Sequence, residues 1–231
     1  MRFHWLHRAN SPNINSVNQA KASTVIVFFS GWGFDDSVVR HLRTDDMTDV
    51  LFVYDYRSLA EPLPDLSHYQ QRILIAWSFG VSAYCAWRQQ QASLGKTTPS
   101  LTQRVAINGS KQAVDRQYGI AEVVMQKTID TLSQESFQHF AARCYNLKPA
   151  ENSQHYCIDV VAAKAELIAV QQRQYHPSDE TWQKIWISRQ DKIFSYRNLS
   201  RAWADWPQQI TVIDAPHVPF AHWQTWHELL E

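Results

Sequence analysis

The chain has 231 residues and equal numbers of basic and acidic side chains, 22 of each, which gives no reason to expect a nucleic-acid partner. Its length is typical of a single α/β domain over residues 1–231, and no apolar run approaches the ~20 residues of a membrane helix. The N-terminus lacks the pattern of a signal peptide, and the chain has too few cysteines for a disulfide framework or a zinc site. We therefore expect a cytoplasmic protein that holds no metal.

After a polar start, the first half of the chain holds four predicted strands, each a short run rich in β-branched or aromatic residues. They cover residues 24–29, 50–54, 72–76 and 104–108. Asp35 and Asp36 are candidate caps of a short helix that reaches about Arg43. A longer helix is predicted from Phe79 to about Ala92.

The pattern changes between about Lys111 and Glu180, where strand-like runs are absent and Phe137 and Phe140 recur at helical spacing. We expect a mostly helical insertion over residues 111–180, with Thr131 and Gln134 as a candidate capping box. Strands are predicted again at 182–188 and 209–213, and a last helix at 220–230. Strands that alternate with helices predict a mainly parallel sheet with helices on both faces, whose ligands bind beyond the carboxyl ends of the strands.

The third predicted strand leads directly into Ala76-Trp77-Ser78-Phe79-Gly80 and then into a helix. This is the small-x-Ser-x-small pattern of a nucleophile elbow, with Ala76 in the place of the first glycine. Small neighbours are needed because the serine sits on a sharp turn, and the helix that follows favours negative charge at its N-terminus. The alternative is a serine that only caps this helix. The strand before and the helix after favour Ser78 as a nucleophile.

A second glycine-containing turn, Ser30-Gly31-Trp32-Gly33, follows the first strong strand. In hydrolases built on such a sheet, this loop and the residue after the nucleophile supply the backbone N–H groups that bind an oxyanion. The pattern therefore predicts Trp32 N–H and Phe79 N–H as the oxyanion hole. A simple glycine turn beside a core tryptophan is the alternative.

His217 and Asp191 are the predicted base and acid. His217 lies just beyond the last predicted strand, whereas His222, its nearest rival, is expected inside the final helix. Asp191 follows the fifth predicted strand, and Asp115, which follows the fourth, is the competing acid. Either aspartate can instead cap a loop or helix. The chain order Ser78, Asp191, His217 is that of the α/β-hydrolases.

With these residues assembled, the chain resembles the BioG-type pimeloyl-acyl-carrier-protein methyl ester esterases. The matching blocks span residues 24–223 and include Phe28-Phe-Ser-Gly-Trp-Gly-Phe-Asp35, Tyr54-Asp-Tyr-Arg57, Ala76-Trp-Ser-Phe-Gly80, Ala106-Ile-Asn-Gly-Ser110, Asp191-Lys-Ile-Phe194 and Pro216-His217. The Gly-Trp-Gly and Trp-Ser-x-Gly pieces also look like BioH-type esterases. The Phe29-Ser30 pair, where that relative commonly has a histidine, favours the BioG type. The residues before Lys21 and the loop at 95–100 depart from the family and are expected to be surface additions.

The resemblance implies an α/β-hydrolase fold and hydrolysis of the methyl ester of pimeloyl-acyl carrier protein in biotin synthesis, without a cofactor. Ser78 would attack the ester, with His217 as base and Asp191 orienting it. The helical insertion would form a lid over an apolar acyl slot. Its candidate liners are Trp32, Trp77, Phe137 and Phe140, although core packing is at least as good an interpretation of the two phenylalanines.

The partner implied by the resemblance is an acidic acyl carrier protein, bound by a monomer. Arg143, Lys148 and Arg173 are candidate docking residues, and Arg143 is also placed among the substrate-binding residues. Solvated surface charges are the alternative for each. Two other functions fit the same motifs, a general small-acyl carboxylesterase or thioesterase and a non-catalytic homologue that binds acyl carrier protein.

Overall fold

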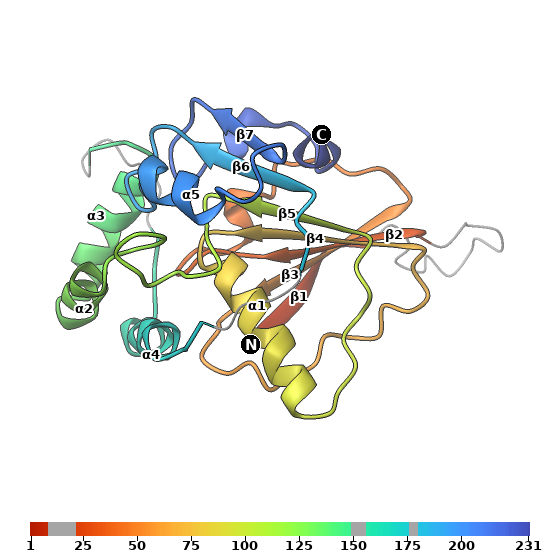
Figure 1. The fold of residues 1–231 in the computed structure, drawn as a ribbon, viewed down its shortest axis with the longest axis horizontal. Helices are drawn as coiled ribbons and strands as arrows, with labels where there is room; N and C mark the ends of the chain where they lie inside the picture. The colour runs from red at the N-terminus through yellow and green to blue at the C-terminus, as the bar shows by residue number, and fades with distance from the viewer. Residues whose placement is uncertain (9–21, 149–155, 176–179) are drawn as a thin grey trace.

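A computed structural model of the chain describes residues 1–8, 22–148, 156–175 and 180–231. Within these residues, the strands form one seven-stranded sheet of order β1-β3-β2-β4-β5-β6-β7 (Figure 1). Only β1 is antiparallel to its neighbour, so the predicted mainly parallel sheet is confirmed. The strands are β1 Arg2–His7, β2 Thr24–Phe29, β3 Thr48–Tyr54, β4 Gln71–Trp77, β5 Gln103–Ile107, β6 Lys184–Ser188 and β7 Ile210–Ile213.

The edge strand β1 lies in the stretch that the sequence pattern assigned to a surface addition, and this expectation is wrong for residues 2–7. The strand pairs with β3, with Arg2 opposite Tyr54 and Trp5 opposite Leu51. Its side chains are exposed or half-buried because an edge strand has a neighbour on one side only. Such a strand does not need the continuous apolar run by which the central strands are identified.

The register of the parallel strands brings their carboxyl ends to one edge of the sheet. Phe29 at the end of β2 lies opposite Ala76 in β4, and Trp77 lies opposite Ile107 in β5. Ser188 at the end of β6 lies opposite Ile213 in β7. The loops after β2, β4, β5, β6 and β7 therefore begin at this edge, where a ligand site is expected.

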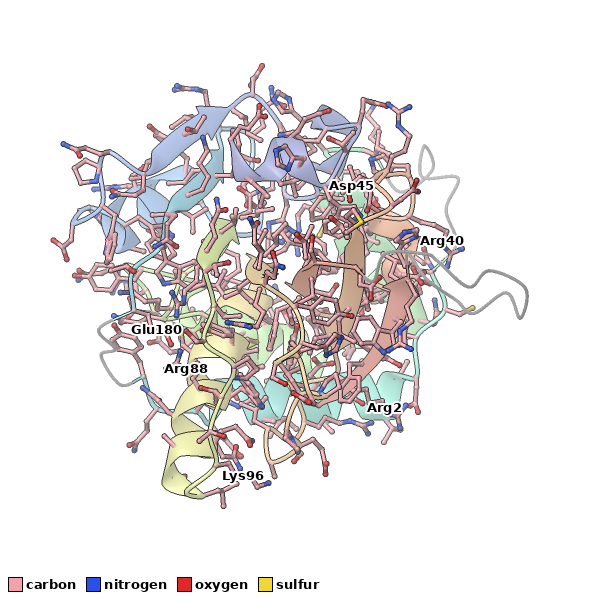
Figure 2. The ribbon with its side chains drawn as sticks, turned by 90° about the vertical axis from the view of Figure 1, so that its right-hand side faces the viewer. Arg2, Arg40, Asp45, Arg88, Lys96 and Glu180 are labelled. Atoms are coloured by element: carbon pink, nitrogen blue, oxygen red, sulfur yellow. The ribbon has the colours of Figure 1, made fainter. Side chains whose placement is uncertain are left out.

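The helices are α1 Phe79–Ser93, α2 Glu122–Asp130, α3 Gln134–Cys144, α4 Val160–Gln171 and α5 Tyr196–Ala202. Figure 1 shows α1 across one face of the sheet and α2, α3 and α4 grouped beyond one end of it. An ion pair between Arg88 of α1 and Glu180, at 3.0 Å, joins α1 to the segment that leads back to β6 (Figure 2). In the described parts of the chain, no helix has the length and apolar character that crossing a membrane requires.

The two faces of the sheet are covered by different elements. Phe29 of β2 packs on Tyr84 and Trp87 of α1. Its neighbour Phe28 points to the other face and packs on Phe220 and Trp226 from the end of the chain. Successive strand residues thus bury rings on opposite faces, as the pleat requires.

The predicted last helix over 220–230 is wrong. Two short 3₁₀ turns stand there instead, η3 Phe220–His222 and η4 His227–Leu230. From residue 220 to residue 229 the buried residues recur every third position, which suits the three residues per turn of a 3₁₀ helix rather than the 3.6 of an α-helix. These buried residues are Phe220, Trp223, Trp226 and Leu229.

The capping box in front of α3 is formed by other residues than the predicted pair. Ser133 and Ser136 form it, since each side chain bonds the other residue's backbone N–H. Thr131 instead follows α2, where its hydroxyl donates to the Lys127 carbonyl at 2.9 Å. By contrast, Asp35 caps the short η1 turn Asp36–Val38 by accepting from the Ser37 N–H, and that turn ends well before Arg43.

Candidate active site

The turn between β4 and α1 holds Ser78 in a strained backbone conformation. Its φ is 57° and its ψ −125°, a region that L-residues rarely occupy. A side chain at Gly80 would place its Cβ 2.1 Å from the Phe29 carbonyl oxygen, so this position must be glycine. Position 76, in contrast, accommodates the methyl group of Ala76 inside the core. The elbow forms with alanine in place of its first glycine.

Three buried side chains form one chain of hydrogen bonds. His217 Nδ1 lies 2.7 Å from Asp191 Oδ2, and His217 Nε2 lies 3.0 Å from Ser78 Oγ. Because an ionised carboxylate only accepts, Nδ1 carries the ring proton and Nε2 accepts from the serine hydroxyl. The Ser78 side chain makes no hydrogen bond that caps α1. Chemically, such a hydrogen-bonded chain can supply a nucleophile, a base and an acid.

The Asp191 carboxylate is itself fixed by backbone donors. Its Oδ1 accepts from the N–H groups of Ile193 at 2.7 Å and Phe194 at 2.9 Å. Oδ2 is therefore left to face the imidazole. A carboxylate oxygen held in this position can accept from the Nδ1 proton of His217.

The structure does not bring the competing residues Asp115 and His222 to Ser78. The Asp115 carboxylate accepts from the backbone N–H groups of Gln117 and Tyr118, at 2.6 and 2.8 Å, and so closes a turn. His222 is exposed in η3, where its ring lies edge-on to Trp223.

Two backbone N–H groups close to Ser78 in the fold are those that the sequence pattern assigned to an oxyanion hole. Phe79 N–H belongs to the open first turn of α1, and Trp32 follows Gly31, whose Cβ position would lie 3.2 Å from Ser78 Cβ. Among the described residues, neither N–H donates a hydrogen bond. Backbone donors without another partner are what an oxyanion hole uses, so both N–H groups stay candidates for that role.

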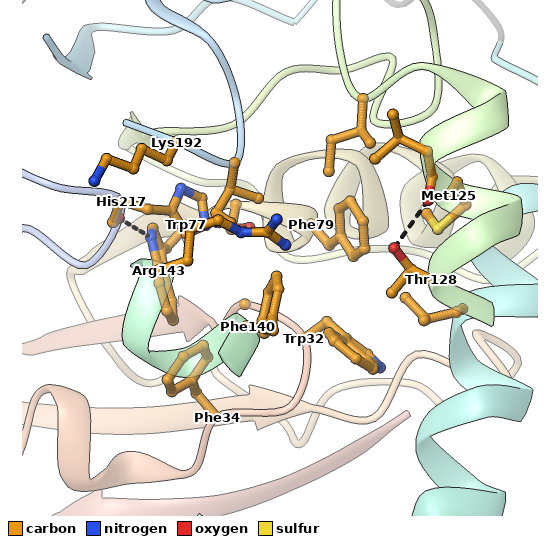
Figure 3. Close-up of a pocket in the computed structure, with 16 residues that line it drawn as sticks. Trp32, Phe34, Trp77, Phe79, Met125, Thr128, Phe140, Arg143, Lys192 and His217 are labelled. Atoms are coloured by element: carbon orange, nitrogen blue, oxygen red, sulfur yellow. Dashed lines mark hydrogen bonds between the residues drawn. The ribbon is translucent and has the colours of Figure 1, made fainter. Parts of the chain in front are cut away.

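A pocket that Ser78 helps to line holds about 610 Å³ of empty space when the open solvent at its mouth is included (Figure 3). Most of its lining is apolar and comes from the glycine turn, the elbow, α2, α3 and α4, with two cations among the lining residues. The pocket side chains are Trp32, Phe34, Trp77, Ser78, Phe79, Ile120, Val124, Met125, Thr128, Phe140, Arg143, Leu167, Lys192, Ile193 and His217. In Figure 3, Arg143 and Lys192 lie on the side of His217, and Met125 and Thr128 lie on the opposite side.

The residues predicted to line the acyl slot lie in different places in the structure. Trp32, Trp77, Phe140 and Arg143 line the pocket. Phe137 does not line it: the ring is fully buried behind Trp32, at a centroid distance of 5.4 Å. Both phenylalanines fit a helical pattern, but only the tertiary contacts of α3 decide which of the two faces the pocket.

The docking role suggested for Arg173 does not fit its position. Its guanidinium is half-buried and donates to the carbonyl of Tyr56, and the buried Glu166 carboxyl lies close by. Burial lowers the pKa of Arg173, while the charge of Glu166 opposes this shift. Its contacts are internal to the protein, whereas Arg143 is exposed at the pocket.

Lys192 and Asn108 are site residues that the sequence interpretation did not assign. Lys192 lies directly after Asp191, and Asn108 is the last residue of the fourth predicted strand, so their chain positions were the available signal. Asn108 is buried, and its side-chain amide donates to the His217 carbonyl at 3.0 Å. No three His, Cys, Asp or Glu side chains gather as metal ligands would within the part of the chain that the structure describes.

Comparisons with known proteins identify the family of the chain. The family model for pimeloyl-ACP methyl esterase BioG matches residues 14–229. A malonyl-[acyl-carrier protein] O-methyltransferase of Bacteroides fragilis is 31% identical over 198 residues, which are 83% of this chain but only 39% of that protein. The chain thus spans about two-fifths of that relative.

Solved structures show the same fold. The crystal structure of BioG from Haemophilus influenzae superposes with a TM-score of 0.82 at 24% identity, and the match covers 100% of both chains. A putative aryl esterase from Burkholderia cenocepacia gives a TM-score of 0.61 at 15% identity, over 87% of this chain and 85% of that one. The fold is that of the α/β-hydrolases, and the family match extends over nearly all of the sequence. The chain belongs to the pimeloyl-ACP methyl esterase BioG family.

Proposed function

We propose that this chain hydrolyses the methyl ester at the far end of a pimeloyl group carried on acyl carrier protein, through an acyl-enzyme on Ser78. The observation that carries the proposal is the hydrogen-bonded chain Asp191–His217–Ser78 beneath an apolar pocket, in a member of this family. The Bacteroides fragilis relative is named for methylating a carboxyl group on acyl carrier protein. An ester of that kind is the bond that we assign to this site.

The first half of the reaction uses the geometry directly. Nε2 of His217 takes the proton of Ser78 Oγ as the oxygen attacks the ester carbonyl. Asp191, held by two N–H groups, stabilises the imidazolium that forms. The Trp32 and Phe79 N–H groups bind the oxyanion of the tetrahedral intermediate, and each such donor is worth about 10²- to 10³-fold in rate.

The second half restores the enzyme. His217 gives its proton to the departing methoxide, which leaves as methanol, and the acyl group remains on Ser78. His217 then takes a proton from water as the water oxygen attacks the acyl carbonyl. It returns this proton to Ser78 Oγ as the bond between that oxygen and the acyl group breaks. The products are methanol and a free carboxylate on the carrier-bound chain. All of these proton transfers take place at one ring nitrogen, Nε2.

The pocket lining supports an acyl substrate. Val124, Met125 and Leu167, from α2 and α4, present apolar surface that methylene groups can contact. We assign residues 111–180 the role of a lid, because α2, α3 and α4 all contribute pocket walls. Arg143 and Lys192 are exposed cations at the pocket and suit an acidic carrier protein.

The test is methanol release from pimeloyl-acyl carrier protein methyl ester. Wild type should turn over this ester much faster than a generic short ester, and Ser78→Ala should abolish turnover. Ser82→Ala is the matched control, since Ser82 lies one turn further along α1 and its hydroxyl bonds the Phe79 carbonyl at 3.0 Å. Cleavage of the generic ester alone would support the general carboxylesterase instead. Inactivity on both esters would favour a carrier-binding homologue.

A further inference from the structure

The buried amide of Asn108 bridges the ends of two strands and the loop that carries His217. Asn108 follows β5 and is 1% exposed. Its Nδ2 donates to Ser188 Oγ at 2.7 Å, to the His217 carbonyl at 3.0 Å and to the Pro216 carbonyl at 3.3 Å. Its Oδ1 accepts from the Ser188 N–H at 2.7 Å. The buried amide is thus engaged through both of its polar atoms.

These contacts reach both loops of the hydrogen-bonded chain. Ser188 ends β6, and its carbonyl accepts from the Asp191 N–H at 3.4 Å. The His217 carbonyl receives a second donor, Trp77 Nε1, at 3.0 Å. The imidazole contacts the Trp77 ring at a centroid distance of 5.5 Å and stacks on Phe194 at 6.0 Å. His217 is therefore fixed at its backbone as well as at its ring.

Asparagine suits position 108 for two reasons. Its φ is 44°, in the left-handed region that asparagine tolerates better than most residues. Its side chain must donate to two carbonyls and also accept from an N–H. An ionised aspartate has the same shape but only accepts, so its oxygen would face the two carbonyl oxygens without a proton between them.

We infer that Asn108 is a positioning residue for His217: its amide holds the His217 backbone so that Nε2 stays within 3.0 Å of Ser78 Oγ. The inference rests on the proposed function of Ser78 and His217. A base displaced by about 1 Å can lose ~10²-fold in rate, so a small movement of this loop is sufficient to slow the reaction. We expect substrate binding to be unchanged when the amide is replaced, because Asn108 does not line the pocket.

Two variants separate the effect of the Asn108 side-chain amide from the effect of its backbone conformation. Asn108→Asp keeps the shape and removes donors, and Asn108→Gly keeps the left-handed backbone and removes the amide. The substrate is 4-nitrophenyl acetate, which needs the nucleophile and base but neither carrier nor long acyl chain. We expect kcat to fall about 10- to 100-fold in each variant, with KM within about twofold of wild type.

Gln91→Glu is the matched control. Gln91 is also a 1% exposed amide that donates to a backbone carbonyl, that of Leu59 at 2.8 Å, but it lies near the end of α1 away from Ser78. Its variant should lose thermal stability and keep kcat. If the Asn108 variants behave in the same way, the amide is merely structural and the inference is overturned.

Folding and mechanism are checked separately. Far-UV circular dichroism shows which variants are folded. If neither Asn108 variant folds, the Ser188→Ala variant is assayed in their place. This variant removes one hydrogen-bond acceptor of the Asn108 amide and leaves the other acceptors. It should lower kcat several-fold, and an unchanged kcat overturns the inference. Ser78→Ala is assayed in parallel. If it retains activity, the proposed function fails; if it is inactive while kcat of the folded Asn108 variants is unchanged, only the role of Asn108 fails.

Discussion

The buried carboxyl of Glu166 makes the stability of the protein depend on pH. Glu166 lies in α4, where it is 8% exposed and accepts from the Tyr56 N–H at 2.9 Å. Burial raises its pKa from 4.5 to about 7, with the Tyr56 hydrogen bond opposing the shift. The folded state therefore binds the proton more tightly than the unfolded chain. The stabilisation is fully present below about pH 4.5 and is lost as the pH rises towards about 7.

The magnitude follows from the raised pKa. Each tenfold difference in proton affinity is worth about 1.4 kcal/mol, so the rise removes about 3 kcal/mol from the free energy of unfolding across this pH window. Glu166→Gln keeps an acceptor for the Tyr56 N–H but has no charge to bury. Relative to wild type, the variant should gain about 3 kcal/mol in stability between pH 4.5 and pH 8.

Urea denaturation at pH 4.5 and pH 8 measures this difference. Glu135→Gln, an exposed substitution on α3, is the control and should show no pH-dependent difference from wild type. A Glu166→Gln difference that is the same at both pH values would refute the reasoning. Helix α4 also contacts the candidate active site, since Trp32 Nε1 donates to the carbonyl of Ala163 in this helix at 3.0 Å.

Three further predictions concern the pocket and its acid. Phe137→Ala should lower the free energy of unfolding, measured by urea denaturation, by about 3–5 kcal/mol because the Phe137 ring is fully buried. Phe140→Ala should mainly raise KM for the carrier-bound ester because Phe140 lines the pocket. Asp191→Asn should lower kcat by ~10⁴-fold in ester hydrolysis while Asp115→Asn leaves it unchanged; equal losses would contradict the assignment of the acid. Lys192→Ala should raise KM for the carrier-bound ester and not for 4-nitrophenyl acetate, and a rise for both would argue against carrier recognition.

The parts of the site that were predictable have local signals. The elbow is a strand, a serine between small residues and a helix in direct succession, and the structure places Ser78 at that turn. His217 and Asp191 were found from their positions after predicted strands, since parallel strands end at one edge of the sheet. The central strands were recognisable because burial on both faces demands continuous apolar runs.

The features that were missed depend on tertiary contacts. Edge strand β1 pairs with β3 and mixes polar with apolar residues, so it lacks the continuous apolar run by which the central strands were recognised. The orientation of α3 separates Phe137 from Phe140, and no local pattern encodes it. The amide of Asn108 meets a carbonyl far along the chain, that of His217, so its importance is visible only when β5, β6 and the loop after β7 are assembled.

The central claim is that Ser78 is an activated nucleophile, and covalent labelling with an active-site serine phosphonate tests it most directly. Intact mass and peptide mapping should show one adduct per chain of wild type, on the peptide that contains Ser78. The same adduct should form with Ser82→Ala and be absent from Ser78→Ala. Folded wild type that takes up no phosphonate, or an adduct that persists in Ser78→Ala, would contradict the account.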